Sequence, residues 1–545
     1  MREQNPAGTQ ITCLALLQRQ ARGFDLREPR VRFDHTAARP QDLLYDRLFM
    51  LRTITAAFIF AFAAWADITL PALFTDHMVI QRNLPVHVWG RASADESISV
   101  AFQGNTKSTT ADSIGMWSVF LPPVEAGGPA ELTIKGRNTI TLRDVVAGDV
   151  WVASGQSNME FEVREAVNAH AEMAAAQRPQ IRLFHVKNRV STYPLDDVVA
   201  EPWASCTAET VQDFSAVAYF FGRDLQEKLG VPIGLIESSW GGTPAEAWTS
   251  LRGLATDASL MPVFVEWARM NDDTVVHQRK REKQLSEWQQ AVARAKAEGK
   301  KPPGFPWEPN MEQSWTPAGL YNAMIAPLTR YPIRGAIWYQ GESNASRERA
   351  PLYARLFGTM IRDWRRAWGQ GDFPFLFVQL ANFKTGEDAR WPELREAQRQ
   401  TLGLANTGMA VATDIGTPDD IHPKNKQEVG RRLALAARAV TYGEKIEYSG
   451  PLFRQATQEG GGMRIWFDHT GSGLTTKDPM LRGFEIAGVD RKFVAARARI
   501  DGATVLVSSP RVTAPAYVRY AWSDNPNGNL YNREGLPASP FRSGE

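Results

Sequence analysis

The sequence has almost no cysteine, since Cys13 and Cys206 are the only two among 545 residues. Two thiols cannot build a disulfide framework or a cysteine-rich metal site, so both classes are excluded. The eight histidines show no metal-ligand spacing with any partner. We therefore expect no metal site.

An excess of charge of one sign is also lacking, because 62 Lys and Arg residues stand against 60 Asp and Glu residues. A net charge of +2 gives no electrostatic reason to expect a nucleic acid partner. The sequence contains no internal repeat or low-complexity segment, and it predicts no particular oligomeric state. With 43% apolar and 22% charged residues the composition is that of an ordinary globular protein, and the length predicts three or four domains.

The apolar run near the N-terminus is too short to cross a membrane. From Met50 the chain reads MLRTITAAFIFAFAAWADITLP, and its apolar stretch covers Ile54–Ala64. A basic start, a short apolar stretch and a small-x-small end are typical of a secretory signal peptide, whereas a membrane span needs about 20 residues. We expect a cleaved signal peptide over 50–66, a non-native or disordered extension over 1–49, no stable membrane span in the mature form and a secreted or periplasmic location. The alternative is a cytoplasmic tail before an uncleaved anchor.

The mature chain divides into three parts by pattern. Residues 67–144 carry short alternating runs such as SISVAF, which predicts an N-terminal β-sandwich. Residues 145–446 alternate apolar runs such as DVWVAS with helical stretches, which predicts an α/β domain built on a doubly wound parallel sheet. A charged helix followed by a proline-rich stretch predicts a helical insertion at about 262–316. Strand patterns return over 447–545 and predict a C-terminal β domain, also of the β-sandwich kind.

Polar, glycine-containing blocks follow four of the apolar runs in the central part. Ligands bind at the carboxyl ends of the strands in a doubly wound sheet, so these blocks are the candidate site. They are Gly155–Glu160, Ser239–Glu246, Gly341–Asn344 and Asp414–Pro423.

The blocks contain the groups that a serine hydrolase needs. A hydroxyl is a poor nucleophile unless an imidazole accepts its proton, and the imidazole needs a carboxylate to orient it. Ser157, at a predicted strand-to-helix turn, supplies the hydroxyl, and His422 supplies the imidazole. The orienting carboxylate is open between Asp419, three residues before the histidine, and Asp420, two residues before it.

The same blocks offer donors for a developing oxyanion. The start of a helix favours negative charge, so the Ser157 N–H is one candidate. Gly241 and Gly242 expose backbone N–H groups, and Asn344 offers a side-chain amide. Three further polar residues are candidates for binding substrate, namely Gln156, Gln340 and Glu342, and for Gln340 and Glu342 the alternative is that they brace the pocket.

The wording of these blocks resembles the SGNH hydrolase superfamily and, within it, the sialate O-acetylesterase branch. The similar segments are GQSNME, SSWGGTPAEAW, WYQGESNA and DIHPKNKQEVG, with FTDHMVIQR and RYAWSDNPNGNLYNREGLPASPFR near the two ends. The resemblance therefore covers roughly residues 67–542. One departure is that the first block reads GQSN, where many superfamily members have GDS. For the orienting carboxylate, the general DxxH pattern of the superfamily points to Asp419, whereas the DIHP motif of this branch makes Asp420 the alternative.

The resemblance implies both a fold and an activity. The fold is the SGNH, flavodoxin-like sheet flanked by β domains. The activity is that of a serine esterase without a cofactor, which removes acetyl groups from carbohydrate hydroxyls, most of all those of O-acetylated sialic acid. The alternatives are an esterase for acetyl-xylan or another plant polysaccharide, and a non-catalytic carbohydrate-binding protein. In every case the expected partner is an acetylated glycan or sugar.

Overall fold

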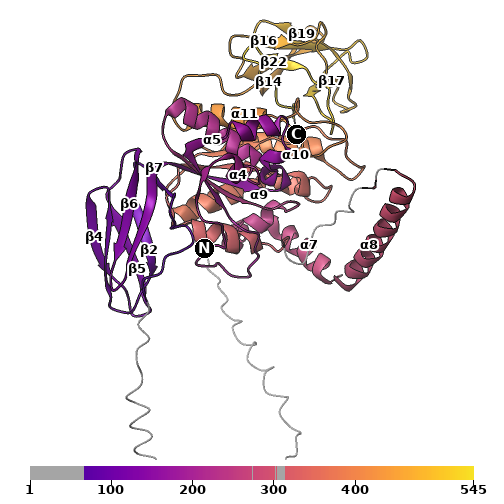
Figure 1. Cartoon of the computed structure of the whole chain (residues 1–545). Coiled ribbons are helices and arrows are strands. Elements are labelled where there is room, and N and C mark those ends of the chain that lie inside the picture. The colour runs from indigo at the N-terminus through magenta and orange to yellow at the C-terminus, as the bar shows by residue number, and fades with distance from the viewer. Residues whose placement is uncertain (1–66, 273, 301, 304–313, 545) are drawn as a thin grey trace, which may run out of the picture. The chain divides into compact units, whose positions relative to one another are not determined.

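The computed structural model describes residues 67–544 except 273, 301 and 304–313 (Figure 1). The predicted extension over 1–49 and the predicted signal peptide over 50–66 lie outside the described residues. Among the residues that are described, no helix is long and apolar enough to cross a membrane.

Short strands make up the N-terminal part. They are β1 (Val79–Gln81), β2 (Val86–Arg91), β3 (Ser97–Phe102), β4 (Asn105–Thr110), β5 (Met116–Leu121) and β6 (Gly127–Lys135). β2 pairs with β5, and β3 pairs with β4 and β6, all antiparallel. Buried positions alternate along β3 and β5, as expected for strands with one face on a core. The predicted β structure is therefore present, and its arrangement as a sandwich stays a prediction.

One long strand, β7 (Thr139–Gly155), joins the N-terminal part to the central sheet. Its first half pairs with β6, and its second half runs between β10 (Ile233–Ser239) and β11 (Gly335–Tyr339). The boundary predicted at residues 144 and 145 thus falls inside a continuous strand. The two parts also share one hydrophobic core, whose buried side chains range from Ile68 to Ala437.

The central sheet is mixed. Its remaining strands are β8 (Arg178–His185), β9 (Ala204–Cys206), β12 (Phe375–Val378) and β13 (Thr407–Ala410). The order is β13-β12-β11-β7-β10-β8-β9, and every neighbouring pair is parallel except β8 with β9. Strands β10 to β13 are buried along their whole length, which explains their continuous apolar runs.

The winding of the central sheet reverses at β7. β8 and β10 lie on one side of this strand, whereas β11, β12 and β13 lie on the other. Such a reversal leaves a crevice outside the carboxyl ends of the strands. Because β7, β10, β11 and β13 are parallel, the four polar blocks that follow them meet at this one edge.

Ten α-helices lie in the described residues. They are α2 (Ser157–Glu160), α3 (Ala169–Ala174), α4 (Ala208–Val211), α5 (Ala216–Leu229), α6 (Leu251–Leu254), α7 (Met261–Asp272), α8 (Thr274–Ala297), α9 (Ala350–Trp368), α10 (Trp391–Thr401) and α11 (Lys426–Val440). Short turns of 3₁₀ or π type are η1 (Val163–Glu165), η2 (Ala245–Trp248), η3 (Ala258–Leu260), η4 (Tyr321–Ile325), η5 (Ala326–Leu328) and η6 (Glu342–Asn344). α7 and the charged α8 fall within the predicted insertion (Figure 1).

Helices cover both faces of the sheet. Trp151 of β7 packs on Phe221 of α5, with ring centroids 5.0 Å apart. Trp338 of β11 packs on Phe357 of α9, with centroids 6.2 Å apart, and its register partner on β7 is Ser154. Trp151 and Ser154 are three residues apart in one strand, so they point to opposite faces. α5 and α9 therefore lie on opposite faces, as in a doubly wound sheet.

The C-terminal part is a separate set of small sheets. Its strands are β14 (Leu452–Glu459), β15 (Gly462–Asp468), β16 (Leu474–Thr476), β17 (Phe484–Ala487), β18 (Val494–Ala495), β19 (Arg497–Asp501), β20 (Thr504–Ser508), β21 (Tyr517–Tyr520), β22 (Leu530–Asn532) and β23 (Phe541–Arg542). They form sheets of order β14-β15-β20-β19, β18-β17-β21-β23 and β16-β22. A hydrophobic core of its own, including Ile465, Val505 and Phe541, holds this part together. A C-terminal β region is therefore present, and its classification as a sandwich stays a prediction.

Candidate active site

Ser157 stands where β7 turns into α2. Gly155 ends the strand with a φ of 144°, and a Cβ added there would lie 2.2 Å from the Tyr339 carbonyl oxygen, so this position requires glycine. Ser157 is the first residue of α2. The N–H at such a position has no acceptor within its own helix and carries the positive end of the helix dipole.

The structure brings Ser157 and His422 together. Ser157 Oγ and His422 Nε2 lie 2.8 Å apart, although 265 residues separate them in the chain. Burial lowers the pKa of His422, and the nearby Lys426 ammonium lowers it further. The imidazole is therefore held in its neutral form, which can accept the serine proton.

The two candidate carboxylates are placed differently. Asp420 Oδ1 accepts the backbone N–H of His422 at 2.9 Å, which is an Asx turn, and lies 4.0 Å from His422 Nδ1. Asp419 is exposed and makes no side-chain hydrogen bond or ion pair within the described part of the chain. The Asx turn explains the difference, since it fixes Asp420 beside the imidazole and leaves Asp419 on the outside. At 4.0 Å the Asp420 contact is longer than a hydrogen bond.

The block Ser239–Glu246 brings Gly241 next to Ser157, but the N–H of this glycine is already hydrogen-bonded. A Cβ on Gly241 would lie 3.3 Å from Ser157 Cβ, so the two residues are in contact. The Gly241 N–H donates to Glu160 Oε2 at 2.6 Å. Gly242 is buried with a φ of 73°, and its N–H donates to no acceptor among the residues described. The N–H groups of Ser157 and Gly242 therefore remain candidate donors for an oxyanion.

Asn344, which the sequence offered as a side-chain amide donor to the oxyanion, is buried and bonded within the protein. Its side chain is 1% exposed, and its Nδ2 donates to Glu246 Oε2 at 2.8 Å. Its Oδ1 accepts from the Ala245 N–H at 2.9 Å and from Gln340 Nε2 at 2.6 Å. Buried amides must have their hydrogen bonds satisfied. In this structure the hydrogen bonds of Asn344 hold Ala245 and Glu246 of the block Ser239–Glu246 in place, rather than offering a donor to substrate.

Gln340 and Gln156 have the same bracing role. Gln340 is fully buried, and its Oε1 accepts the Tyr353 hydroxyl at 2.8 Å. Gln156 is 3% exposed, and its Oε1 accepts the backbone N–H groups of Gly341 and Ser343 at 3.4 and 3.3 Å. For Gln340 the sequence left substrate binding and bracing open, and bracing fits its contacts. Gln156 was expected only to bind substrate, but its side-chain oxygen instead accepts from the block Gly341–Asn344. The physical reason is that both amides find their partners inside the protein.

Glu342 belongs to a buried polar cluster that sequence reasoning missed in part. Asn158 Nδ2 donates to Glu342 Oε1 at 2.6 Å and to the Ile421 carbonyl at 3.0 Å, while Lys426 Nζ donates to Asn158 Oδ1. Burial raises the pKa of Glu342 and lowers that of Lys426 to about 7. Asn158, the residue after the nucleophile, is thus hydrogen-bonded to Ile421, the residue before the histidine. Its place next to Ser157 was the only signal in the sequence.

A cleft of about 720 Å³ opens beside Ser157 and His422. Its lining includes six carboxylates, from Glu160, Glu162, Glu165, Asp213, Glu237 and Asp420, and a single lysine, Lys187. His185 also lines it, and its Nε2 lies 2.9 Å from Glu237. The hydrogen bond that His185 donates to Glu237 raises the pKa of His185, whereas burial, followed by the charge of Glu237, raises the pKa of Glu160. Sequence patterns gave no sign of this acidic lining.

The described residues hold no group of three or more His, Cys, Asp or Glu side chains placed to bind a metal ion. The side chains that line the cleft include a hydroxyl, two imidazoles, carboxylates and one lysine amine.

Comparisons with known proteins agree with this picture. The sialic acid-specific acetylesterase family of carbohydrate esterases matches residues 308–439, a range that contains His422 and both candidate aspartates. Sialate O-acetylesterases from Rattus norvegicus and Mus musculus are 34% and 35% identical, each over 72% of this chain and 76% of the relative. The crystal structure of a carbohydrate acetylesterase from Xanthomonas citri is 41% identical, with a TM-score of 0.76 over 88% of this chain and 99% of that one.

The predicted relationship is therefore confirmed over most of the chain. The chain belongs to the sialate O-acetylesterase family of carbohydrate esterases.

Proposed function

We propose that this protein is a serine esterase that hydrolyses O-acetyl esters on carbohydrates, with Ser157 as nucleophile and His422 as general base. The observation that carries the proposal is the 2.8 Å contact between Ser157 Oγ and His422 Nε2 at a helix start inside a cleft. Membership of the family supports the substrate class.

The reaction follows from the geometry in two halves. Ser157 Oγ attacks the acetyl carbonyl carbon while His422 Nε2 takes the serine proton, and the N–H groups of Ser157 and Gly242 face the negative oxygen. His422 then returns the proton to the departing sugar oxygen, which leaves an acetyl-enzyme. Water attacks the acetyl-enzyme by the same route and releases acetate and Ser157. Asp420, the carboxylate nearest Nδ1, stabilises the imidazolium formed in each half.

The lining of the cleft favours one of the two substrate classes. Proteins bind sugar carboxylates with arginine forks, and like charges repel. Sialic acid carries a carboxylate, but the described lining has six carboxylates and no arginine. Arg164 pairs with two of them, Glu162 and Asp213, which leaves four without an arginine partner among the residues that the structure describes. A neutral acetylated polysaccharide, such as acetyl-xylan, therefore suits the cleft better than sialate, while the curated relatives point to sialate. We propose the neutral glycan as the second candidate and a secreted or periplasmic site of action for either substrate.

Acetate release from O-acetylated sialic acid and from acetyl-xylan, measured side by side, tests both points. Ser157→Ala should abolish release from either substrate. The matched control is Ser118→Ala, because Ser118 Oγ also lies 2.7 Å from a histidine, His87 Nε2, but on paired strands outside the cleft. Full activity of Ser157→Ala would refute the proposed nucleophile. Faster turnover of sialate than of xylan would refute the charge argument.

A further inference from the structure

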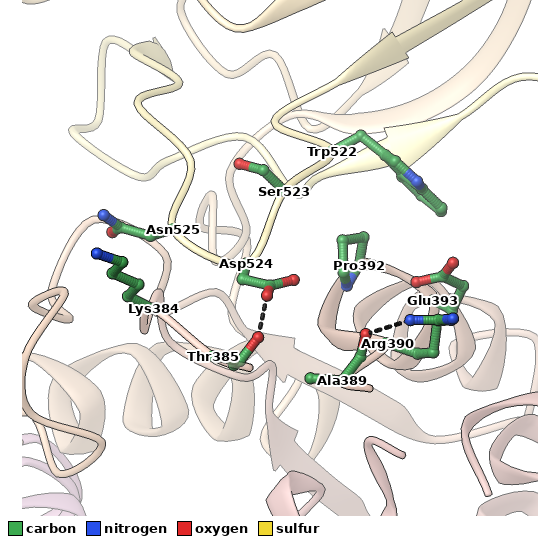
Figure 2. Close-up of a pocket in the computed structure, with 10 residues that line it drawn as sticks. All are labelled: Lys384, Thr385, Ala389, Arg390, Pro392, Glu393, Trp522, Ser523, Asp524 and Asn525. Atoms are coloured by element: carbon green, nitrogen blue, oxygen red, sulfur yellow. Dashed lines mark hydrogen bonds between the residues drawn. The ribbon is translucent and has the colours of Figure 1, made fainter. Parts of the chain in front are cut away.

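We propose that a groove between the central sheet and the C-terminal part is a second carbohydrate-binding site, which holds the glycan chain that carries the ester. We call it the Trp522 groove. Segment Lys384–Glu393 lines one side and segment Trp522–Asn525 the other, around a volume of about 500 Å³ (Figure 2). The identity of the ligand as a carbohydrate rests on the proposed function.

Hydrogen bonds hold the two sides of the Trp522 groove in place. Arg395 is fully buried and donates to the carbonyls of Ser523 and Asp524, each at 2.8 Å. Asn382 Nδ2 donates to Asn525 Oδ1 at 2.8 Å, and the Thr385 hydroxyl donates to the Asp524 carboxylate. The groove is therefore a built feature, so a ligand would not have to order it.

The side chains along the groove combine an aromatic ring with charged groups that have no protein partner in the described residues. The half-buried Trp522 has the Arg542 guanidinium 5.0 Å from its ring centroid. Figure 2 shows its indole at one end of the groove, near Pro392 and Glu393, and Lys384 beside Asn525 at the other end. The amine of Lys384 and the carboxylate of Glu393 make no hydrogen bond or ion pair in the part of the chain that the structure describes.

This combination fits a sugar chain better than other ligands. The C–H faces of pyranose rings pack on aromatic rings, and their hydroxyls need both donors and acceptors. Charges of both signs, from Lys384, Arg390, Glu393 and Asp524, give no preference for an anion or a cation. A shallow polar groove with one tryptophan therefore points to an uncharged polymer of sugars.

The Trp522 groove adjoins the loop that carries the catalytic imidazole. The Lys384 N–H donates to the Pro418 carbonyl at 3.0 Å, four residues before His422. A Cβ on Gly416 would lie 2.5 Å from Asn382 Oδ1, so the two loops are in contact. These loops follow β12 and β13, which are parallel neighbours, and they lie at the edge of the sheet where Ser157 lies. A glycan longer than one or two sugars could occupy the groove while an acetyl group enters the cleft.

Binding measured apart from catalysis tests the inference. In a Ser157→Ala background, affinity electrophoresis through gels that contain acetyl-xylan should show strong retardation. Trp522→Ala should weaken this binding about tenfold or more, as expected when an aromatic platform is lost. Trp522→Tyr should keep most of it. The matched control is Trp466→Ala, because Trp466 is another half-buried tryptophan of the C-terminal part with an arginine, Arg454, 5.9 Å from its ring.

Kinetics with Ser157 intact separate this site from the reacting groups. Trp522→Ala should raise KM for acetyl-xylan about tenfold and leave kcat/KM for 4-nitrophenyl acetate unchanged. Retardation of Trp522→Ala equal to that of its parent, equal losses in Trp466→Ala, or no retardation of the parent would each overturn the inference. Failure of the esterase proposal would show instead as absent acetate release, which the binding assay does not measure.

Discussion

At the scale of single residues, burial sets the protonation of the proposed base. His422 has its pKa lowered from the usual value of about 6.5, first by burial and then by Lys426. The neutral imidazole acts as the base, so kcat/KM rises with pH through this pKa. We predict an acidic limb for 4-nitrophenyl acetate hydrolysis that lies below pH 6.5. Lys426→Met removes a positive charge and should move the limb to higher pH. A wild-type limb at or above 6.5 would contradict the assignment.

The two neighbouring aspartates give a second prediction. Asp420 lies nearest His422 Nδ1, whereas Asp419 is exposed. Asp420→Asn keeps the acceptor for the Asx turn but removes the charge that stabilises the imidazolium. It should lower kcat roughly tenfold, well short of the ~10⁴-fold loss found where the carboxylate bonds the imidazole directly. Asp419→Asn should change kcat by less than about twofold, as surface substitutions do. Steady-state kinetics of the two variants measure the losses in kcat. A larger loss in Asp419→Asn than in Asp420→Asn would identify Asp419 as the orienting carboxylate.

Glu160 gives a third prediction, because its carboxylate holds the Gly241 N–H at 2.6 Å. That bond fixes the turn in which Gly242 presents its own N–H. Glu160→Gln keeps an oxygen acceptor and should retain most of kcat for 4-nitrophenyl acetate, whereas Glu160→Ala should lose roughly tenfold. Equal rates in the two variants would show that this hydrogen bond does not support the oxyanion site, and a gain in Glu160→Ala would show that the carboxylate blocks it.

At the scale of elements, the site depends on how closely α11 packs on α5. α11 begins at Lys426, directly after the His422 loop, and a Cβ on Gly430 would lie 2.6 Å from Phe220 Cβ of α5. A glycine is therefore required there for steric reasons, although its φ is ordinary for a helix. The α9 glycine, Gly358, differs, since a Cβ there would meet its nearest neighbour, the Arg362 side chain, at 3.4 Å.

These two helix glycines make a matched pair for a stability prediction. Gly430→Ala must push α11 away from α5 and should cost about 1–3 kcal/mol of unfolding free energy, with a loss of activity. Gly358→Ala should instead stabilise the protein by up to about 1 kcal/mol, because alanine is the better helix former. Denaturant unfolding measures both changes. Similar effects of the two substitutions would refute the packing argument.

The sequence predicted the ends of the strands well. It predicted the roles of the side chains that follow those ends less well. Apolar runs flanked by glycine located the ends of β7, β10 and β11, because buried parallel strands leave that pattern. The bracing role of Asn344 could not be predicted, and that of Gln340 could not be told from substrate binding, since both depend on hydrogen bonds between blocks about 100 residues apart. The boundary near residue 144 was placed inside β7 for a similar reason. The aspartates and the glycine near the middle of β7 form a local pattern that is typical of a turn. Pairing with β6 and then with β10 nevertheless keeps the strand continuous.

At the scale of the whole molecule, the C-terminal part has its own core but is tied to the central sheet through Arg395. This guanidinium donates to the carbonyls of Leu380, Ala381, Ser523 and Asp524. Burial lowers the pKa of Arg395 to about 9. A buried cation that satisfies four carbonyls is hard to replace, because each carbonyl left without a donor costs free energy.

We predict that Arg395→Met destabilises the protein by about 3–5 kcal/mol and separates the unfolding of the C-terminal part from that of the rest. Differential scanning calorimetry would show a lower and broader, or divided, transition. The control is Arg454→Met, an exposed arginine 3.5 Å from Asp468, which should change stability by less than about 1 kcal/mol. An unchanged melting temperature in Arg395→Met would show that the two parts are held together by other contacts.

The most direct test of the central claim identifies the residue that carries the acetyl group during turnover. The wild-type protein is mixed with 4-nitrophenyl acetate, quenched with acid within the first turnover, digested and mapped by mass spectrometry. The account predicts an acetyl ester on the peptide that contains Ser157, and none in His422→Ala, in which the serine proton has no acceptor. An acetyl ester on a different residue, or turnover in Ser157→Ala at the wild-type rate, would contradict it.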